Sequence, residues 1–279
     1  MTGRSVLEPA SAARGAHGAR SVPILMYHQV ASVQPPSYAR YTVSLKAFSA
    51  QMRWLALARY TALTMDGLLE AWSRRSRLPA RAVVITFDDG FRDCVRLAVP
   101  VLQRHGLRAT FYLVAGLVGG TSRWTLATSG TAFPLLDWAE ARALLEAGME
   151  CGAHSLTHPP LAELGPPDQQ EELAESRRVL EDQLGREIRH LAYPFGSVNR
   201  NVREAAERAG YVSACTTDKG LARAGDDPLM LRRVPIYGSD SLVDFVFRLR
   251  TAETARQTLR RRAPRGALAL YRKLRGEAP

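Results

Sequence analysis

AVVITFDDG, residues 82–90, is the stretch that decides the fold of this chain. The apolar run 82–87 has the length and continuous hydrophobicity of a strand buried on both faces, as in a parallel sheet. Gly90 follows directly, and glycine lets the backbone turn sharply where a strand stops. Side chains alternate between two faces inside a regular strand, but the alternation breaks at a turn. Asp88 and Asp89 are therefore expected to face one site together.

A second stretch, HSLTH at residues 154–158, supplies two histidines four residues apart. Neutral imidazoles at this spacing can converge on one metal ion. Two adjacent carboxylates repel each other unless their roles differ, and a cation bound by one of them would separate those roles. Each stretch alone has a simpler interpretation, a solvated turn for the first and two unrelated histidines for the second. The combination favours a metal site.

A third stretch, LAYPFG at residues 191–196, comes after these two. The order and spacing of all three resemble the polysaccharide deacetylases, carbohydrate esterase family 4. The similarity extends over residues 21–250, with further matching stretches at residues 23–28, 109–113, 136–138 and 148–153. Members of that family remove acetyl groups from N-acetylated sugars. The resemblance implies an α/β fold, a distorted (β/α) barrel of about seven parallel strands.

Strands and helices are expected to alternate along the chain. Strands are predicted at residues 22–27, 60–64, 82–87, 109–114, 149–153, 189–193, 212–216 and 229–234. Helices are predicted after a Ser44 cap and at residues 66–72, 93–105, 137–147, 168–184, 199–209 and 241–250. The alternation implies parallel pairing in an open sheet or a barrel, and the resemblance selects the barrel. The candidate residues then follow the carboxyl ends of strands, where barrel sites lie.

The sequence departs from the usual family pattern at two places. Ala192 stands where the third motif carries an arginine. No histidine follows His190, although the late motif of the family supplies the general acid. The chain is closer to the subgroup that acts on poly-N-acetylglucosamine and similar exopolysaccharides. In that subgroup an early Met-Tyr-His strand provides the acid, and His28 occupies this position.

The resemblance implies metal-assisted hydrolysis of an amide. Asp89, His154 and His158 would hold one divalent ion, with zinc expected and cobalt, nickel, manganese or iron as alternatives. Asp88 would take a proton from the attacking water. His28, protonated, would give a proton to the departing amine.

Four further residues are assigned to the substrate side of the site. The backbone N–H of Phe195 is expected to bind the oxyanion, and Pro194 and Gly196 to shape the turn that presents it. Trp124 lies in a long loop, residues 116–133, and is expected either to stack on a sugar face or to plug the core.

Two arginines and one histidine stay without a settled role. Arg232 or Arg233 is a candidate replacement for the missing motif arginine, pairing with Asp88 and lowering its pKa. A surface ion pair would explain the two arginines equally well. His190 is interpreted as a surface or helix-end residue.

Composition fits one barrel-sized domain, because 279 residues with 46% hydrophobic and 23% charged residues describe an ordinary globular chain. No apolar run approaches the ~20 residues of a membrane span. Residues 1–20 lack the apolar region of a secretory signal, so a disordered tail and a cytoplasmic location are expected. Three scattered cysteines do not make a disulfide framework.

The net charge of +11 is concentrated at the end of the chain, where residues 251–279 hold eight Lys or Arg and two Glu. Ala267, Leu270, Tyr271 and Leu274 would share one face of a helix. This basic segment is either an amphipathic helix on an anionic membrane surface or a solvated tail. No nucleic-acid-binding module accompanies the charge.

The expected activity is removal of N-acetyl groups from N-acetylhexosamine units of a polysaccharide or its precursor, with the glycan as partner. Two alternatives stay open: an amidase for a small linear or cyclic amide, and a sugar-binding protein without activity. An open groove with exposed aromatic residues would favour a polymer, and a lidded pocket would favour a small molecule. The sequence does not indicate the oligomeric state.

Overall fold

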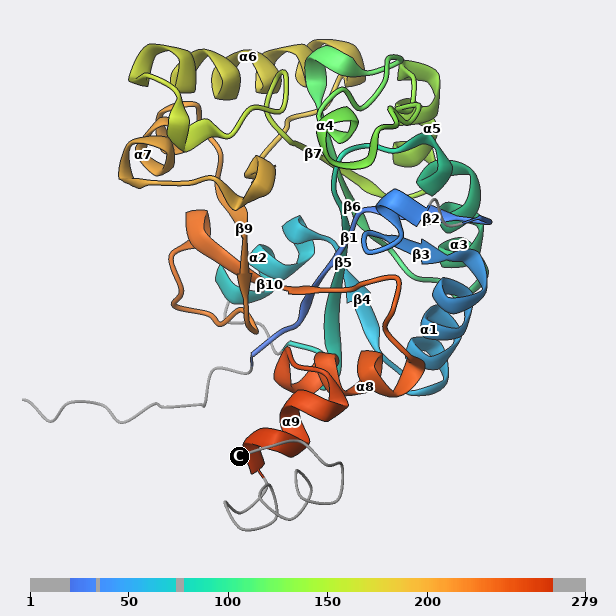
Figure 1. The fold of residues 1–279 in the computed structure, drawn as a ribbon. Helices are drawn as coiled ribbons and strands as arrows, with labels where there is room; N and C mark the ends of the chain where they lie inside the picture. The colour runs from blue at the N-terminus through green and yellow to red at the C-terminus, as the bar shows by residue number, and fades with distance from the viewer. Residues whose placement is uncertain (1–20, 34–35, 74–77, 263–279) are drawn as a thin grey trace, which may run out of the picture.

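The computed structural model describes residues 21–33, 36–73 and 78–262. A barrel of parallel strands forms its centre (Figure 1). The barrel strands are β1 (Ile24–Tyr27), β5 (Ala82–Phe87), β6 (Thr110–Leu113), β7 (Glu150–Ala153), β8 (His190–Ala192), β9 (Ser213–Lys219) and β10 (Leu231–Pro235). They are hydrogen-bonded in the order β1-β10-β9-β8-β7-β6-β5, and pairing of β1 with β5 closes the ring. The predicted barrel of about seven parallel strands is confirmed.

β5 lies where the barrel closes and has two neighbours along one of its edges. β4 (Thr61–Leu63) pairs with residues 82–84, and β6 pairs with Thr86 and Phe87. β1 runs along the other edge. All six residues of β5 are buried, which accounts for its uninterrupted apolar sequence. The carboxyl end of β5 is thereby placed beside those of β1 and β6.

Small residues leave space inside the barrel. One buried cluster contains Val84, Tyr112, Ala192 and Cys215. A Cβ atom at Gly152 would lie 2.6 Å from the ring of Tyr112, so only glycine fits there. Residues that alternate with these along the strands point outward and pack beneath the helices.

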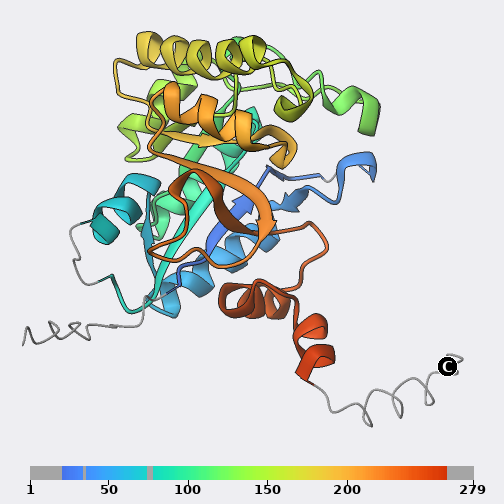
Figure 2. The ribbon, with the colours of Figure 1, turned by 90° about the vertical axis from the view of Figure 1, so that its left-hand side faces the viewer.

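Helices surround the barrel (Figures 1 and 2). Ser44 caps the first of them, accepting a hydrogen bond from the N–H of Ala47, and Asp137 closes a capping box at α5. Figure 2 shows α6 and α7 together at one end of the molecule and α8 and α9 at the other. The helices are α1 (Leu45–Leu57), α2 (Met65–Ser73), α3 (Val99–Arg104), α4 (Thr125–Ser129), α5 (Trp138–Glu146), α6 (Pro166–Leu184), α7 (Arg200–Arg208), α8 (Leu242–Thr251) and α9 (Ala255–Arg262).

Several local features were not predicted, among them α4 within the 116–133 loop. β2 (Gln29–Ala31) and β3 (Thr42–Ser44) form a separate parallel pair directly after β1. A π-helical turn, Cys94–Ala98, precedes α3. Three-residue strands are too short to show a period of two, and Pro100, which has no N–H to donate, accounts for the altered hydrogen bonding before α3.

The two ends of the chain were assigned as tails in the sequence analysis. Residues 1–20, and residues 263–279 with the expected amphipathic face, lie outside the described residues. Among the helices of the described part, none combines the length and the hydrophobicity that a membrane span requires.

The interpretation of His190 as a surface or helix-end residue is wrong. It belongs to β8 and is 1% exposed. Its Nδ1 lies 2.8 Å from Ser213 Oγ, and its Nε2 lies 3.0 Å from Asp66 Oδ1. Arg189 also pairs with Asp66. The strand predicted at residues 189–193 already contains this position, and a parallel strand of a barrel is buried on both faces.

Asp66→Asn is expected to lower stability at neutral pH but not in acid. The hydrogen bond with His190 and the charge of Arg189 hold the pKa of Asp66 below its usual value, so this stabilisation is present above pH ~4 and is lost as pH falls through the lowered pKa. Because the carboxylate is half exposed, the loss is about 1 kcal/mol or less, roughly 2 °C in Tm. Thermal unfolding of both proteins from pH 7 to pH 3 checks this, and a constant Tm difference would contradict it.

Candidate metal centre and catalytic site

Three predicted ligands meet at one end of the barrel. Asp89 follows β5, and His154 follows β7. The Nε2 atoms of His154 and His158 lie 3.3 and 3.2 Å from the same oxygen, Oδ1 of Asp89. All three side chains are buried, and one donor atom from each lies within 4.8 Å of the others. Two imidazole nitrogens and one carboxylate oxygen therefore converge, as the sequence predicted.

The backbone at this end is unusual. Asp89, Ser155, His158 and Phe195 all have positive φ, between 58° and 74°. A residue with a side chain pays an energetic cost in this region, and such conformations gather at functional sites. Gly90, at φ 71°, continues the same turn without that cost. The sharp turn after β5 directs Asp88 and Asp89 to different partners at a single site.

The loop between the two histidines is held from α6. The carboxylate of Glu172 accepts hydrogen bonds from the backbone N–H groups of Leu156 and Thr157, both at 2.9 Å. Within the loop, the N–H of His158 donates to Ser155 Oγ at 3.0 Å. Glu172 was not predicted from the sequence, because Glu172 lies outside the three motifs and the sequence of its helix does not distinguish it from neighbouring acidic residues.

Burial and mutual contact set the ionisation of the three ligands. Burial alone would raise the pKa of Asp89, but hydrogen bonds with His154 and His158 hold that pKa well below its usual range. Burial lowers the pKa of His158. Burial acts on His154 in the same direction, but the contacts with Asp89 and the charge of Asp88 outweigh it and raise the pKa of His154. The carboxylate is therefore ionised, as a metal ligand must be.

Asp88 turns away from the cluster and pairs with Arg233 of β10. Nη1 and Nη2 of Arg233 each donate to one carboxylate oxygen of Asp88, both at 2.7 Å, and Nε donates to the carbonyl of Thr216 at 2.9 Å. Burial would raise the pKa of Asp88, but the charge and hydrogen bonds of Arg233 hold it below its usual value. Of the two arginines considered, Arg233 is fully buried and makes this pair.

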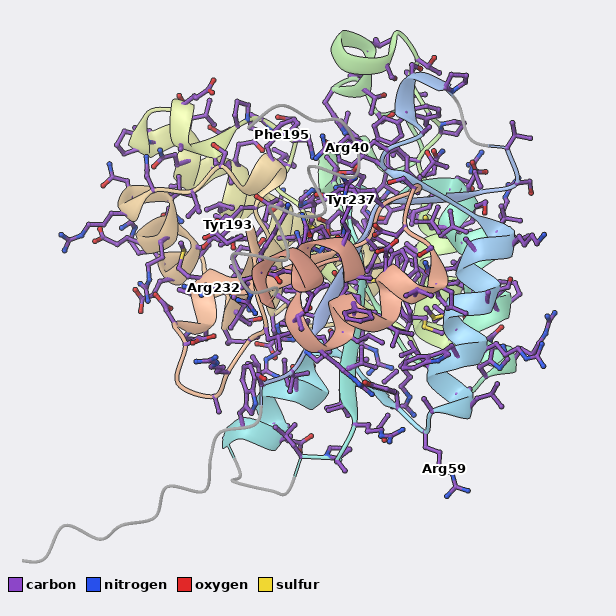
Figure 3. All side chains as sticks on the ribbon, turned by 60° about the horizontal axis from the view of Figure 1, so that its bottom comes forward. Arg40, Arg59, Tyr193, Phe195, Arg232 and Tyr237 are labelled. Carbon is purple, nitrogen blue, oxygen red and sulfur yellow. The ribbon has the colours of Figure 1, made fainter. Side chains whose placement is uncertain are left out.

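The position of Arg233 explains the alanine in the third motif. Ala192 and Cys215 are small residues inside the barrel, and they leave space for a long side chain from the neighbouring strand. The guanidinium of Arg233 lies over the ring of Tyr112 at 5.9 Å. Arg232 lies on the exposed face of β10 and is labelled in Figure 3. The next residue along the strand thus points inward and reaches Asp88.

His28 directly follows β1, and the N–H of Asp88 donates to the carbonyl of Tyr27 at 3.0 Å. The charge of His28 contributes to lowering the pKa of both Asp88 and Asp89. Its ring packs 5.2 Å from that of Tyr41, which comes from the loop between β2 and β3. His28 therefore lies beside the candidate base.

The Pro-Phe-Gly turn follows β8 and faces the same cluster. The ring of Phe195 lies 4.6 Å from that of His158, yet the residue is 55% exposed (Figure 3). In this turn the N–H groups of Gly196 and Ser197 donate to the carbonyls of Tyr193 and Pro194. Proline has no N–H, which leaves the N–H of Phe195 as the donor that the turn can offer to a substrate.

Gly196→Ala is expected to reduce turnover through the backbone alone. At φ 69° an added Cβ is strained, and it would collide with the hydroxyl of Thr217. The turn must shift, and loss of one oxyanion donor is worth up to about 10²–10³ in kcat. Gly185→Ala is the matched control, because Gly185 has φ 62° and open space around it. Equal kcat for the two variants would show that the turn presents no catalytic group.

Trp124 packs against the core and lies beside a candidate metal ligand. It is half buried, and its ring stacks on the imidazole of His158, with centroids 4.0 Å apart and planes 20° apart. The ring therefore contacts a candidate metal ligand, while the stacking on a sugar face stays a prediction.

The donor set fits a divalent metal. Two imidazoles with one carboxylate suit zinc, and also cobalt, nickel, manganese or iron, so the residues do not select among these ions. The N–H at Nδ1 of His154 donates to the carbonyl of Ala192 at 2.7 Å, which leaves Nε2 free to bind a metal. A second cluster in the described residues fits a metal less well, and it consists of Asp66, Glu150 and His190. Its carboxylates already have partners: Asp66 pairs with Arg189, and Glu150 accepts hydrogen bonds from the backbone N–H groups of Met65 and Asp66.

Comparisons with known proteins agree with this geometry. A family model described as polysaccharide deacetylase matches residues 75–214. YxkH of Bacillus subtilis, a protein assigned to the polysaccharide deacetylases, is 28% identical over 215 residues, covering 77% of this chain and 71% of its own. The poly-beta-1,6-N-acetyl-D-glucosamine N-deacetylase of Staphylococcus epidermidis is 23% identical over 203 residues, covering 70% and 68%. The structure of the Streptococcus pyogenes deacetylase PplD in complex with acetate superimposes with a TM-score of 0.73 at 27% identity, covering 83% and 99%.

Proposed function

Because this chain belongs to the polysaccharide deacetylase family, we propose that it hydrolyses the N-acetyl groups of N-acetylhexosamine units in a polysaccharide, with a divalent metal at Asp89, His154 and His158. One observation carries the proposal: an ionised carboxylate, Asp88, is held by Arg233 directly beside the three converging ligands. A ligand set alone would suit a structural metal. A separate, fixed base next to it suits hydrolysis.

The residues of the site have separate roles in hydrolysing the amide. A divalent ion at the three ligands would supply Lewis acidity, lowering the pKa of a water and polarising the acetyl carbonyl. Asp88 accepts the proton of the water as its oxygen bonds to the carbonyl carbon. The N–H of Phe195 donates to the carbonyl oxygen as negative charge develops there.

Collapse of the tetrahedral intermediate breaks the C–N bond. His28, in its protonated form, gives its proton to the departing nitrogen, so the products are acetate and a free amine on the sugar. Arg233 holds Asp88 in one orientation through two parallel hydrogen bonds and takes no proton itself.

Two findings support a glycan rather than a small amide as substrate. A relative that covers most of this chain is named for action on poly-beta-1,6-N-acetyl-D-glucosamine. Phe195 is exposed beside the candidate ligands, where a sugar ring could contact it.

The test is release of acetate and amine from β-1,6-linked N-acetylglucosamine oligomers, compared with small linear and cyclic amides at equal concentration. The proposal predicts equimolar acetate and free amine from the oligomers, with a higher kcat/KM than for any small amide. Turnover of small amides alone would favour the amidase. Binding of oligomers without any turnover would favour a sugar-binding protein.

A further inference from the structure

The two histidines of the cluster are held in different ways. Nδ1 of His154 is fixed by the carbonyl of Ala192 at 2.7 Å. Nδ1 of His158 is buried and meets no hydrogen-bond partner among the described residues. Metal-ligating histidines almost always have such an outer partner, which orients the ring. Something else must orient His158.

Aromatic rings surround the imidazole of His158 instead. Trp124 stacks on one face, with centroids 4.0 Å apart, and Phe195 approaches at 4.6 Å with the planes at 73°. His154 lies edge-on at 4.8 Å. The stacked ring of Trp124 restrains rotation of the imidazole about its Cβ–Cγ bond, since a turned ring would collide with the indole. The side chain is therefore held by packing where a hydrogen bond is absent.

The segment that carries Trp124 is tied to the turn that carries Asp89. The N–H of Ser122 donates to the carbonyl of Phe133, and the N–H of Phe133 donates to Ser122 Oγ. Further along the same segment, the N–H of Leu136 donates to the carbonyl of Gly90 at 2.9 Å. The position of the indole is thus fixed relative to the turn of Asp89 and Gly90 rather than to the loop alone.

We propose that Trp124 is a positioning residue that holds His158 in the orientation needed to bind the metal, in place of the missing hydrogen bond at Nδ1. The inference rests on the proposed metal site but not on the identity of the substrate. It assigns the 116–133 loop a role in assembling the site. The flat face of the indole ring holds the orientation of His158, so another aromatic ring at position 124 should also hold it.

The test measures metal binding without any glycan. The dissociation constant for Co²⁺ and the visible spectrum of the bound ion are determined for the wild-type protein and for Trp124→Ala, Trp124→Phe and Trp54→Ala. Trp124→Ala is expected to bind Co²⁺ about 10–100-fold more weakly, with an altered spectrum, as loss of an outer partner does elsewhere. Trp124→Phe keeps a stacking face and is expected to stay close to wild type.

Trp54→Ala is the matched control, because Trp54 packs on Tyr60 and Phe245, away from the ligands. Its loss should lower Tm without changing the affinity for Co²⁺. If Trp124→Ala does not fold, Trp124→Leu makes the same comparison with an apolar side chain that has no ring.

An unchanged dissociation constant and spectrum in a folded Trp124→Ala or Trp124→Leu protein would overturn the inference. Failure of the deacetylase proposal would appear separately, as wild-type protein that binds Co²⁺ yet releases no acetate.

Discussion

Asp88→Asn is expected to lower the kcat for acetate release by about 10²–10⁴, the contribution of a positioned general base. Asparagine keeps the size of the side chain but can no longer accept the proton of the attacking water. The three ligands, Asp89, His154 and His158, are unchanged, so the variant should still bind one equivalent of metal. Steady-state acetate release and metal content, measured on the same preparation, check both statements.

Asp93→Asn is the control for this variant. Asp93 lies five residues further along, and its carboxylate accepts a long contact, 3.4 Å, from Gln29. Its removal should leave kcat within a few-fold of wild type. An Asp88→Asn protein that retains its metal and works within tenfold of wild type would show that another group takes the proton.

Arg233→Met is expected to damage both stability and activity. The variant leaves the carboxylate of Asp88, 2% exposed, without its partner, and breaking a buried pair in this way costs about 3–5 kcal/mol. Burial then outweighs the remaining charges of His154 and His28 and raises the pKa of Asp88, so the base is protonated at a higher pH than in wild type. The acid limb of the kcat/KM profile should shift upward, and Tm should fall.

Arg232→Met provides an unusually close comparison, because the neighbouring arginine lies on the exposed face of the same strand. Its effect on the free energy of unfolding should stay within about 0.5 kcal/mol, with an unchanged pH profile. Similar Tm values and pH profiles for the two variants would mean that the Asp88–Arg233 pair is not what keeps the base ionised.

The barrel and the ligand set could be predicted because local sequence determines them. A six-residue apolar run, a glycine at the strand end and two histidines four residues apart each act over a few residues, and Asp89, His154 and His158 meet as expected. The Ser44 cap was equally local. The family resemblance then selected a closed barrel over an open sheet, which periodicity could not do.

The partners of these residues could be predicted only as far as the choice between Arg232 and Arg233 for Asp88, because they come from distant parts of the chain. Arg233 reaches Asp88 across 145 positions, and only the inward register of β10 separates it from Arg232. Glu172 holds the histidine loop from an otherwise ordinary helix. His190 is buried because β8 is a barrel strand. Trp124 contacts His158 because the segment that carries Trp124 is hydrogen-bonded to Gly90. Each of these contacts depends on how strands, helices and loops from distant parts of the chain are aligned in the fold.

The central claim is that the three converging ligands hold the metal on which deacetylation depends. The most direct measurement is a titration of metal-stripped protein with Zn²⁺ while acetate release from N-acetylglucosamine oligomers is followed, with His154→Ala measured in parallel. We expect no release at zero metal and a linear rise to a plateau at one equivalent, with no such rise for His154→Ala. Full activity in the stripped protein, or a plateau that His154→Ala also reaches at one equivalent, would contradict this claim.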